Sequence, residues 1–220
     1  MKAIKFFERY SYIFFFVIYF FVGLSIVDDF GISIDEEFQR YSGFYWLCYV
    51  LEFLPFEQLK SEALEKYKLN ISNIKKRDYI IIVDYSKDIF QKRLWLYDII
   101  NDDILLNSRV THALNSGLIF CNDISNTPKT KKTCIGSFAT GNQYYGKFGN
   151  SMNIHGLDNN NSNANKRRIV FHPNCKHKYY GVTIPSFLAL YSSGCFAFHE
   201  DDMDPFIEKV KNGVFMYVNN

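Results

Sequence analysis

The chain has 220 residues, of which 48% are hydrophobic, 18% aromatic and 22% charged, and its formal net charge is +2. Its length allows one domain with an appendage, or two small domains. The composition excludes disorder, collagen and a coiled coil for most of the chain, and the many Phe and Tyr residues favour a β-rich or membrane-contacting protein. The charge is too close to neutral for nucleic-acid binding to be the default, and glycine motifs for phosphate or dinucleotides are absent.

The N-terminal part of the chain carries an apolar run without charge. No residue of Tyr10–Val27 is charged, and Lys2, Lys5 and Arg9 precede the run. A helix of this length extends roughly 27 Å, enough to cross the core of a bilayer. The positive flank predicts that the N-terminus stays in the cytoplasm and that the remainder is exported. We expect an uncleaved transmembrane anchor over residues 1–27, with a cleaved signal peptide as the alternative.

Residues 28–77 predict a juxtamembrane helical region. The aromatic run Phe44–Leu51 is too short to cross a membrane, and its Trp and Tyr favour a helix at the interface. Residues 57–68 have the pattern of a charged helix, followed by a basic linker. The composition changes at Asp78, so residues 78–220 are expected to form a separate β-rich domain with a core of its own.

Runs of β-branched and aromatic residues in this second part predict several strands. They lie at residues 79–83, 93–97, 104–106, 110–112, 168–172 and 214–218. The second and third of these runs are separated by Asn-Asp-Asp and have the pattern of a hairpin. Residues 115–165, rich in Gly, Asn, Ser and Thr, predict short strands and long loops around a site, and residues 204–211 predict a short helix. The expected fold class is mainly β.

Cys195 and His172 are the strongest candidates for chemistry. Five cysteines is an odd count, so an exported chain keeps at least one unpaired thiol. Gly194 permits a tight turn in which the sulfur of Cys195 stands beside its own N–H, as a nucleophile with an oxyanion-binding amide requires. His172 ends an apolar strand and is a candidate for the base that takes the thiol proton. The alternatives are a buried structural cysteine and a histidine capping a strand edge.

Two further arrangements of these residue types remain open. Cys121 and Cys134 could form a disulfide in an oxidising compartment. A zinc site is a weaker alternative because the ligand spacing matches no zinc knuckle, and we expect neither metal nor cofactor. Its ligands would be His172, Cys175 and His177, with Cys195 or His199 as the fourth.

A series of segments follows in order through the second part of the chain. They are Asp84–Lys87, Lys92–Leu94, Thr111–Ala113, Asn115–Gly117, Ser125–Pro128, Ile135–Phe138, Thr140–Lys147, Gly156–Asp158, Asn161–Ala164, Arg168–His172 and Ser192–Cys195. In this order they resemble the L,D-transpeptidase catalytic-domain family, the murein-remodelling cysteine transpeptidases. The resemblance covers nearly two thirds of the chain.

This resemblance implies a β-sandwich-like catalytic domain and a defined chemistry. Cys195 would attack the carbonyl of the L-centre of meso-diaminopimelate in a peptidoglycan stem peptide, the terminal D-Ala would leave, and an amine of a second stem, or water, would resolve the thioester. His172 would be the base, amides near Gly194 and Cys195 would hold the oxyanion, and Ser192 matches a serine of the family. Tyr145, Gly146, Lys147 and Arg168 are the expected substrate-binding residues. The partners would be peptidoglycan stem peptides and, through the N-terminal helix, the membrane, with no nucleic acid. The implied location is the inner membrane, single-pass, with the catalytic domain in the periplasm.

The chain departs from the family pattern around the nucleophile. The family commonly has Gly-Arg before the serine, an aromatic residue before the glycine and Pro after the cysteine. The corresponding residues here are Leu190, Tyr191, Ser193 and Phe196. The missing Arg removes a cation that would bind a carboxylate or lower the thiol pKa, and Lys147, Arg167 or Arg168 are candidates to replace it. The alternative function is a catalytically inactive, membrane-anchored cell-wall-binding module.

The first 60 residues resemble another family. Phe30–Glu36, followed by Gln39–Arg40 and Ser42–Gly43, is similar to the start of polytopic, polyprenol-dependent glycosyltransferases, and Asp35 matches their catalytic acidic residue. A single spanning helix cannot form their lipid-substrate cavity, so we interpret this part as a remnant used as an anchor. A fragment of a membrane glycosyltransferase is the second alternative for the function, and a solvated helix start is the simpler reading of the acidic residues.

Overall fold

The computed structural model describes residues 56–174, 177–179, 182–184 and 191–220, the two short central ranges by their backbone alone. Residues from Gln58 to Asn220 form one compact unit. The predicted anchor and the aromatic run Phe44–Leu51 lie outside the described residues. None of the helices in the described part of the chain is long and apolar enough to cross a membrane.

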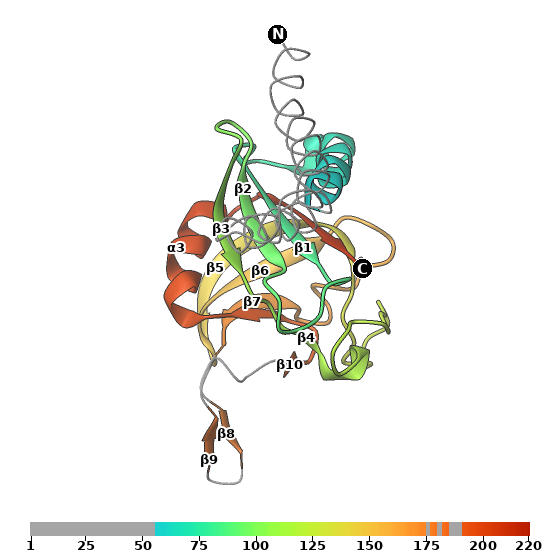
Figure 1. The fold of residues 1–220 in the computed structure, drawn as a ribbon, viewed down its shortest axis with the longest axis vertical. Helices are drawn as coiled ribbons and strands as arrows, with labels where there is room; N and C mark the ends of the chain where they lie inside the picture. The colour runs from blue at the N-terminus through green and yellow to red at the C-terminus, as the bar shows by residue number, and fades with distance from the viewer. Residues whose placement is uncertain (1–55, 175–176, 180–181, 185–190) are drawn as a thin grey trace, which may run out of the picture. The chain divides into compact units, whose positions relative to one another are not determined.

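An eight-stranded sheet with the order β11-β7-β6-β5-β12-β1-β2-β3 dominates this unit (Figure 1). Its strands are β1 (Tyr79–Asp84), β2 (Leu94–Asp98), β3 (Asp103–Ser108), β5 (Gly136–Gly146), β6 (Gly149–Gly156), β7 (Val170–Pro173), β11 (Phe196–Phe198) and β12 (Phe215–Asn219). Neighbours are antiparallel except for β1 with β12 and β7 with β11, which run parallel. The predicted mainly β class is therefore confirmed.

Two small two-stranded sheets and two 3₁₀ turns complete the β part. They are β4 (His112–Ala113) with β10 (Tyr191–Ser192), β8 (His177–Tyr179) with β9 (Val182–Ile184), η1 (Ile71–Asn73) and η2 (Leu114–Ser116). The parallel β4–β10 pair connects the segment before the 114–133 loop to the segment that carries Cys195.

The strands predicted from β-branched runs are present within a few residues of their expected bounds, but the prediction for residues 115–165 was partly wrong. The β5–β6 hairpin, with strands of 11 and 8 residues, is the longest in the sheet rather than a set of short strands. Gly, Ser, Thr and Asn occupy many of its positions, which hides the strand signal. Tertiary packing, rather than local residue type, determines that these segments form strands, because Phe138 and Met152 are fully buried in the core.

The sheet curls around a single hydrophobic core. Val83 and Leu94, from one half of the sheet, belong to the same buried cluster as Phe171 and Phe196 from the other end. The ring of Tyr85 stacks on Phe196 with their centroids 6.1 Å apart. Fully burying one such side chain contributes about 1.5–3 kcal/mol, so these contacts across the curl hold β11, and with it Cys195, in place.

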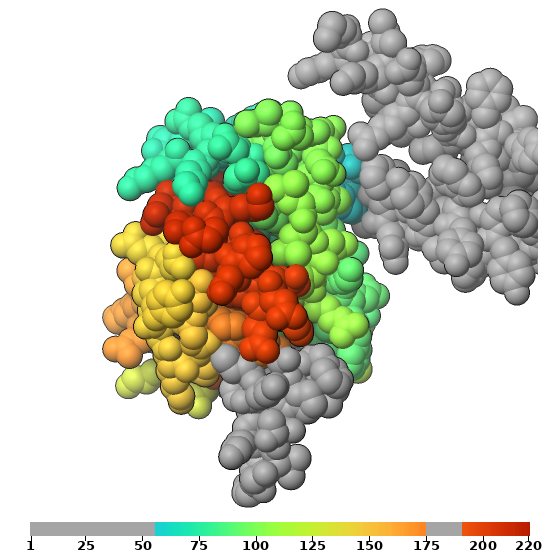
Figure 2. Space-filling view, turned by 90° about the vertical axis from the view of Figure 1, so that its left-hand side faces the viewer, coloured from blue at the N-terminus to red at the C-terminus, as the bar shows by residue number. Residues whose placement is uncertain are grey.

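Helix α3 (Glu200–Val210) covers part of the outer surface. The acidic residues of its first turn interact favourably with the positive end of the helix dipole. This interaction stabilises a helix start four residues before the predicted one. Met203, Phe206 and Val210 form its buried face. Figure 2 shows α3 between the β3 region in green and the β5–β6 hairpin in yellow.

The predicted charged helix is confirmed over residues 56–69. The Tyr67 ring packs against Phe215 of β12 with centroids 5.7 Å apart, and the Tyr217 hydroxyl donates to Glu62. Lys60 pairs with Asp102 at 3.4 Å, beyond the end of β2. The helix therefore belongs to the same packed unit as the sheet.

Candidate active site

Cys195 lies at the end of a tight turn between β10 and β11. Gly194 adopts φ +113°, a conformation that side-chain-bearing residues rarely adopt, and a Cβ there would stand 3.0 Å from the carbonyl oxygen of Lys132. The Ser192 hydroxyl donates to the Cys195 carbonyl at 2.7 Å and accepts the Gly194 N–H at 3.1 Å. Ser192 thus closes the turn that presents the sulfur, and the Gly194 amide is directed at Ser192.

Thr111 holds the same segment from the other side. Its backbone N–H donates to the carbonyl of Ala197 at 2.9 Å, and its hydroxyl donates to the carbonyl of Cys195 at 3.2 Å. The hydroxyl also accepts the N–H of Ala197 at 3.1 Å. One threonine therefore fixes the backbone on both sides of Phe196, and with it the position from which the Cys195 side chain projects.

The thiol of Cys195 is half-buried against the backbone that leads into β7. Its Sγ lies 3.6 Å from the carbonyl oxygen of Arg168, which accepts the thiol hydrogen. Burial raises the thiol pKa above its ordinary value, while the N–H of Val170 and the guanidinium of Arg167 act in the opposite direction. The resting thiol is therefore neutral near pH 7, so it needs a base to become a nucleophile.

His172 lies on the strand beside Cys195. In the parallel β7–β11 pair, His172 is opposite Ala197 and Phe171 is opposite Phe196. Residues that are opposite each other in a parallel pair share a face of the sheet, so His172 and Ala197 lie on one face, and Cys195 directly precedes β11. The imidazole Nδ1 is 2.9 Å from the carbonyl oxygen of Pro173. A carbonyl only accepts, so Nδ1 carries the proton of the neutral ring and the basic lone pair is on Nε2.

The tip of the β5–β6 hairpin approaches His172. The ring of Phe148 stacks on the imidazole with centroids 4.4 Å apart, and the Lys147 ammonium lies 5.6 Å from the centre of the Phe148 ring. Tyr145 is 79% exposed on the same hairpin, and Gly146 ends β5. The hairpin tip thus reaches His172 through Phe148, and the predicted substrate-binding residues Tyr145, Gly146 and Lys147 directly precede Phe148 in the chain.

Arg168, the fourth predicted substrate-binding residue, contributes its backbone to the site. Its φ is +56°, and its carbonyl faces the Cys195 sulfur while its side chain is exposed. The neighbouring Arg167, rather than Arg168, turns its guanidinium toward the nucleophile's turn.

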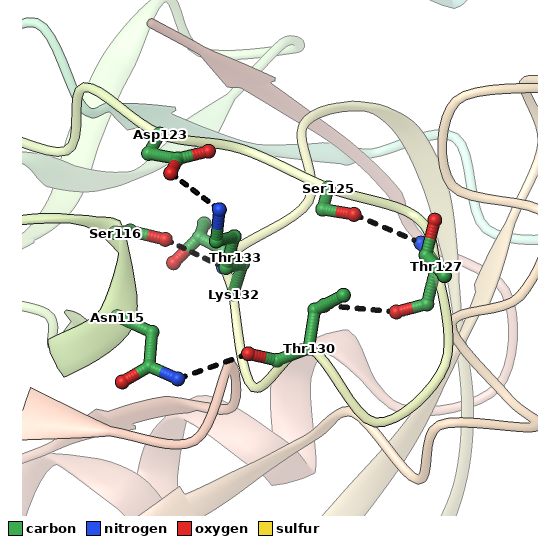
Figure 3. Close-up of polar contacts among 8 residues, drawn as sticks. All are labelled: Asn115, Ser116, Asp123, Ser125, Thr127, Thr130, Lys132 and Thr133. Carbon is green, nitrogen blue, oxygen red and sulfur yellow. Dashed lines mark hydrogen bonds and ion pairs between the residues drawn. The ribbon is translucent and has the colours of Figure 1, made fainter.

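The 114–133 loop forms another border of the site and is cross-linked by its own polar groups (Figure 3). The Lys132 ammonium pairs with Asp123, and the Ser116 hydroxyl accepts the Thr133 N–H at 2.8 Å. The Asn115 amide donates to the carbonyl of Thr130 at 3.0 Å. These bonds tie the two arms of the loop together and give a long irregular segment a fixed shape.

A second set of bonds staples this loop to residues 158–168. The Asn126 side-chain amide donates to the carbonyl of Asn159 at 2.8 Å, and its Oδ1 accepts the Asn163 N–H at 3.0 Å. Arg167 donates from Nη1 to the carbonyl of Ser125 and from Nη2 to the carbonyl of Lys132. The loop is therefore held against the segment that leads into β7 and His172.

A buried arginine and a buried histidine support the site from beneath. Arg93 is fully buried and donates to the carbonyl of Val110 at 3.0 and 2.8 Å, to the carbonyl of Lys87 at 3.1 Å and to Nδ1 of His112 at 2.8 Å. His112 Nε2 donates to the carbonyl of Gly117 at 2.8 Å. Burial lowers the pKa of the His112 imidazole, and the Arg93 charge lowers it further. His112, in β4, is thus a neutral structural residue of the β4–β10 pair.

Arg93→Met is expected to lower the free energy of unfolding by about 3 kcal/mol, because it leaves buried carbonyl groups and an imidazole nitrogen without their donor. Denaturant unfolding followed by circular dichroism measures the change. The exposed Arg109 offers a control, and Arg109→Met is expected to change stability by less than about 0.5 kcal/mol. Equal effects of the two substitutions would contradict a structural role for the Arg93 contacts.

The other two described cysteines, Cys121 and Cys134, are both unpaired and buried, so the structure does not contain the disulfide considered from sequence. Burial raises the pKa of the Cys134 thiol to about 11 and also raises that of Cys121. Both thiols are poor nucleophiles at neutral pH. Cys175 and the side chain of His177, considered as zinc ligands, lie outside the described residues.

The free energy of unfolding is expected to fall between about pH 9 and 11 by up to about 2–3 kcal/mol through Cys134 alone. The folded-state pKa is above the unfolded one, so the folded state holds this proton more tightly and loses the advantage as pH rises. Chemical unfolding at pH 8 and pH 11 of the wild type and of Cys134→Ala isolates this contribution. Identical pH dependence in both proteins would rule it out.

The structure thus brings most of the predicted site residues together. Cys195, Ser192 and Gly194 share one turn, and His172 lies on the adjacent strand. Roles for Thr111 and for the Arg93–His112 pair could not be predicted from residue type, since their contacts join segments distant in the chain. Arg167 was one of three candidate cations, and its position in the fold distinguishes it from the other two.

Comparison with solved structures gives weak overall similarity. The helical cell shape determining protein Pgp2 from Campylobacter jejuni is 14–16% identical, with TM-scores of 0.39–0.41, covering 66% of this chain and 48–50% of that one. An L,D-transpeptidase from Mycobacterium smegmatis is 9% identical, with a TM-score of 0.39, covering 65% of this chain and 59% of that one. L,D-transpeptidase 1 from Mycobacterium tuberculosis is 11% identical, with a TM-score of 0.36, covering 65% and 62%. The chain covers less than two thirds of each of these proteins.

No curated protein matches the chain. The sequence does match the L,D-transpeptidase catalytic domain family over residues 54–219, which is most of its length and contains every residue of the candidate site. The match begins after the segment that resembles glycosyltransferases, so that resemblance stays a prediction. The chain belongs to the L,D-transpeptidase catalytic domain family.

Proposed function

We propose that the protein is a peptidoglycan L,D-transpeptidase that works by cysteine acyl transfer. The Cys195 sulfur attacks the carbonyl carbon of the L-centre of meso-diaminopimelate in a stem tetrapeptide. A C–S bond forms, the amide C–N bond to the terminal D-Ala breaks, and the thiol proton passes through His172 to the leaving amine. The amine of a second stem then displaces the thiolate to give a crosslink, or water displaces it to give a tripeptide.

The pairing of β7, which carries His172, with β11, which begins directly after Cys195, is the observation that carries this proposal. The Nδ1–Pro173 bond directs the basic lone pair to Nε2, which is the arrangement a general base requires. Burial keeps the Cys195 thiol neutral at rest, so deprotonation has to be coupled to attack. Cys195 supplies the nucleophilic sulfur for that step, and His172 accepts the thiol proton.

The backbone amide of Cys195 is the donor we assign to the developing oxyanion. The Gly194 N–H is directed at the Ser192 hydroxyl, so Ser192 acts by holding the turn instead of by touching the substrate. A fixed amide beside the nucleophile stabilises charge without reorganising during the reaction. Tyr145, Lys147 and the exposed Arg168 side chain border the site and are proposed to contact the stem peptide.

An inactive cell-wall-binding module is the competing function. The raised thiol pKa and the tyrosine at position 191, in place of the family's arginine, favour it. Intact-mass measurement after incubation with a tetrapeptide stem, and separately with a carbapenem, decides between the two. We expect an acyl adduct that peptide mapping places on Cys195. Folded protein that binds stem peptides without forming an adduct would establish the binding module.

We further propose that the domain is exported and held at the inner membrane by a helix over Tyr10–Val27. The support is the charge-free run and its basic flank in the sequence. Protease added to intact spheroplasts is expected to degrade the domain, with cytoplasmic enzymes as the protected control. Degradation only after lysis would contradict export.

A further inference from the structure

Arg167 packs against the turn that carries the nucleophile. A Cβ built on Gly194 would stand 3.5 Å from Arg167 Nη2 and 3.0 Å from the carbonyl oxygen of Lys132, to which the same Nη2 donates. The guanidinium therefore lies between the 114–133 loop and the Gly194–Cys195 turn. Its planar fork suits this place, because Nη1 and Nη2 bond two separate carbonyls, those of Ser125 and Lys132.

The charge of Arg167 is not neutralised by these contacts. Both acceptors are carbonyl oxygens, and among the ion pairs of the described residues none includes Arg167. Lys132 and Asp123 in the same loop neutralise each other. A half-buried cation without a carboxylate partner attracts any negative charge that develops nearby, and more strongly than it would in open water.

Other described cations near the site are placed differently. The buried Arg93 guanidinium is occupied by the carbonyls of Val110 and Lys87 and by His112 of β4. The side chain of Arg168 is exposed. Position 191, where the family has arginine, holds a tyrosine whose hydroxyl donates to the carbonyl of Leu118 at 2.6 Å.

The other titratable groups found around the thiol in the described part of the chain are neutral at pH 7. Tyr85 and Cys134 approach Cys195 from β1 and from the start of β5, and burial raises the pKa of both. His172, on β7, is neutral when it acts as a base. Among the described residues, Arg167 is thus the permanently charged group that acts on the Cys195 thiol.

We propose that Arg167 is a positioning residue that both stabilises the thiolate of Cys195 and holds the 114–133 loop against the nucleophile's turn. This role is the one left open by the tyrosine at position 191, and it rests on the proposed function of Cys195 as the nucleophile. The loop contacts set the geometry, and the uncompensated charge lowers the free energy of the thiolate relative to the thiol.

The thiol pKa of Cys195 tests this proposal directly. Alkylation by iodoacetamide, which is neutral, is followed from pH 6 to 11 by peptide mapping in the wild type, Arg167→Gln, Arg167→Lys and Lys166→Gln. Removing the charge in Arg167→Gln is expected to raise the pH midpoint of alkylation, which reports the thiol pKa, by about half a unit to one unit. Alkylation at pH 7 is expected to slow about three- to tenfold. Lys166 is exposed in the same segment, so Lys166→Gln controls for the loss of one charge and is expected to leave the midpoint unchanged.

Arg167→Lys distinguishes the effect of the charge from that of the bonds to the Ser125 and Lys132 carbonyls. It also tests the charge if the glutamine variant does not fold. It keeps the charge but loses the fork, so its midpoint is expected within about 0.3 units of the wild type. A folded glutamine variant with the wild-type midpoint, or a lysine variant with a midpoint about one unit higher, would overturn the proposal. Small-reagent alkylation needs no stem peptide, so this failure is distinguishable from a failure of the transpeptidase function, which is read from adducts on the wild type.

Discussion

Cys195→Ser is expected to abolish adduct formation on tetrapeptide stems while the fold stays intact. A serine hydroxyl is a far weaker acid than a thiol, and a single imidazole cannot compensate for that difference, so acyl transfer should fall at least about a thousandfold. The replacement exchanges one sulfur for one oxygen at a half-buried position. A hydroxyl can still donate to the Arg168 carbonyl, and we expect the free energy of unfolding to change by less than about 1 kcal/mol.

Intact mass and muropeptide analysis, with and without an acceptor stem, measure this loss. Cys134→Ser is the matched control, because it makes the same atomic exchange at another unpaired thiol, which is buried. The control is expected to retain the adduct. Crosslinked or tripeptide product from folded Cys195→Ser at a rate near that of the wild type would show that the nucleophile lies elsewhere.

His172→Gln is expected to slow acylation by about a hundredfold to ten-thousandfold at pH 7, the contribution typical of a positioned general base. Glutamine retains an amide that can donate to the Pro173 carbonyl but has no basic nitrogen. The defect should shrink as pH rises toward and beyond the thiol pKa, because hydroxide then generates the thiolate without help from the protein.

The pH dependence of carbapenem acylation and of iodoacetamide alkylation measures this effect. His199→Asn serves as the control, since His199 caps α3 and asparagine is a good capping residue. Its profile should match the wild type. If His172→Gln and the wild type react at equal rates across the whole pH range, His172 has a structural role only.

The fold could be predicted from sequence where local residue type and burial agree. The run Tyr79–Val83 is β-branched because β1 is buried in the middle of the sheet, and both properties appear in the same residues. The β5–β6 hairpin could not be predicted in this way. Its strands contain Gly and Asn, and the outer partner of β5 is β12, which lies far away in the chain.

Some residues of the candidate site could likewise be predicted from the sequence, and others could not. Cys195 and His172 are visible in the sequence because few residue types perform nucleophilic and basic chemistry, and Gly194 marks the turn. The role of Arg167 depends on two carbonyl oxygens some 40 residues earlier in the chain, at Ser125 and Lys132, and backbone acceptors leave no trace in residue type. The role of Thr111 could not be predicted either, because its partners are backbone groups near Cys195.

The place of β12 constrains how the protein is made. This strand is synthesised after every other strand of the sheet, yet it lies between β5 and β1 and hydrogen-bonds to both. Without β12 the sheet would consist of two parts, β11-β7-β6-β5 and β1-β2-β3, each with an unpaired inner edge. The sheet therefore cannot close before β12 has been synthesised, and its long-range pairings predict slow folding.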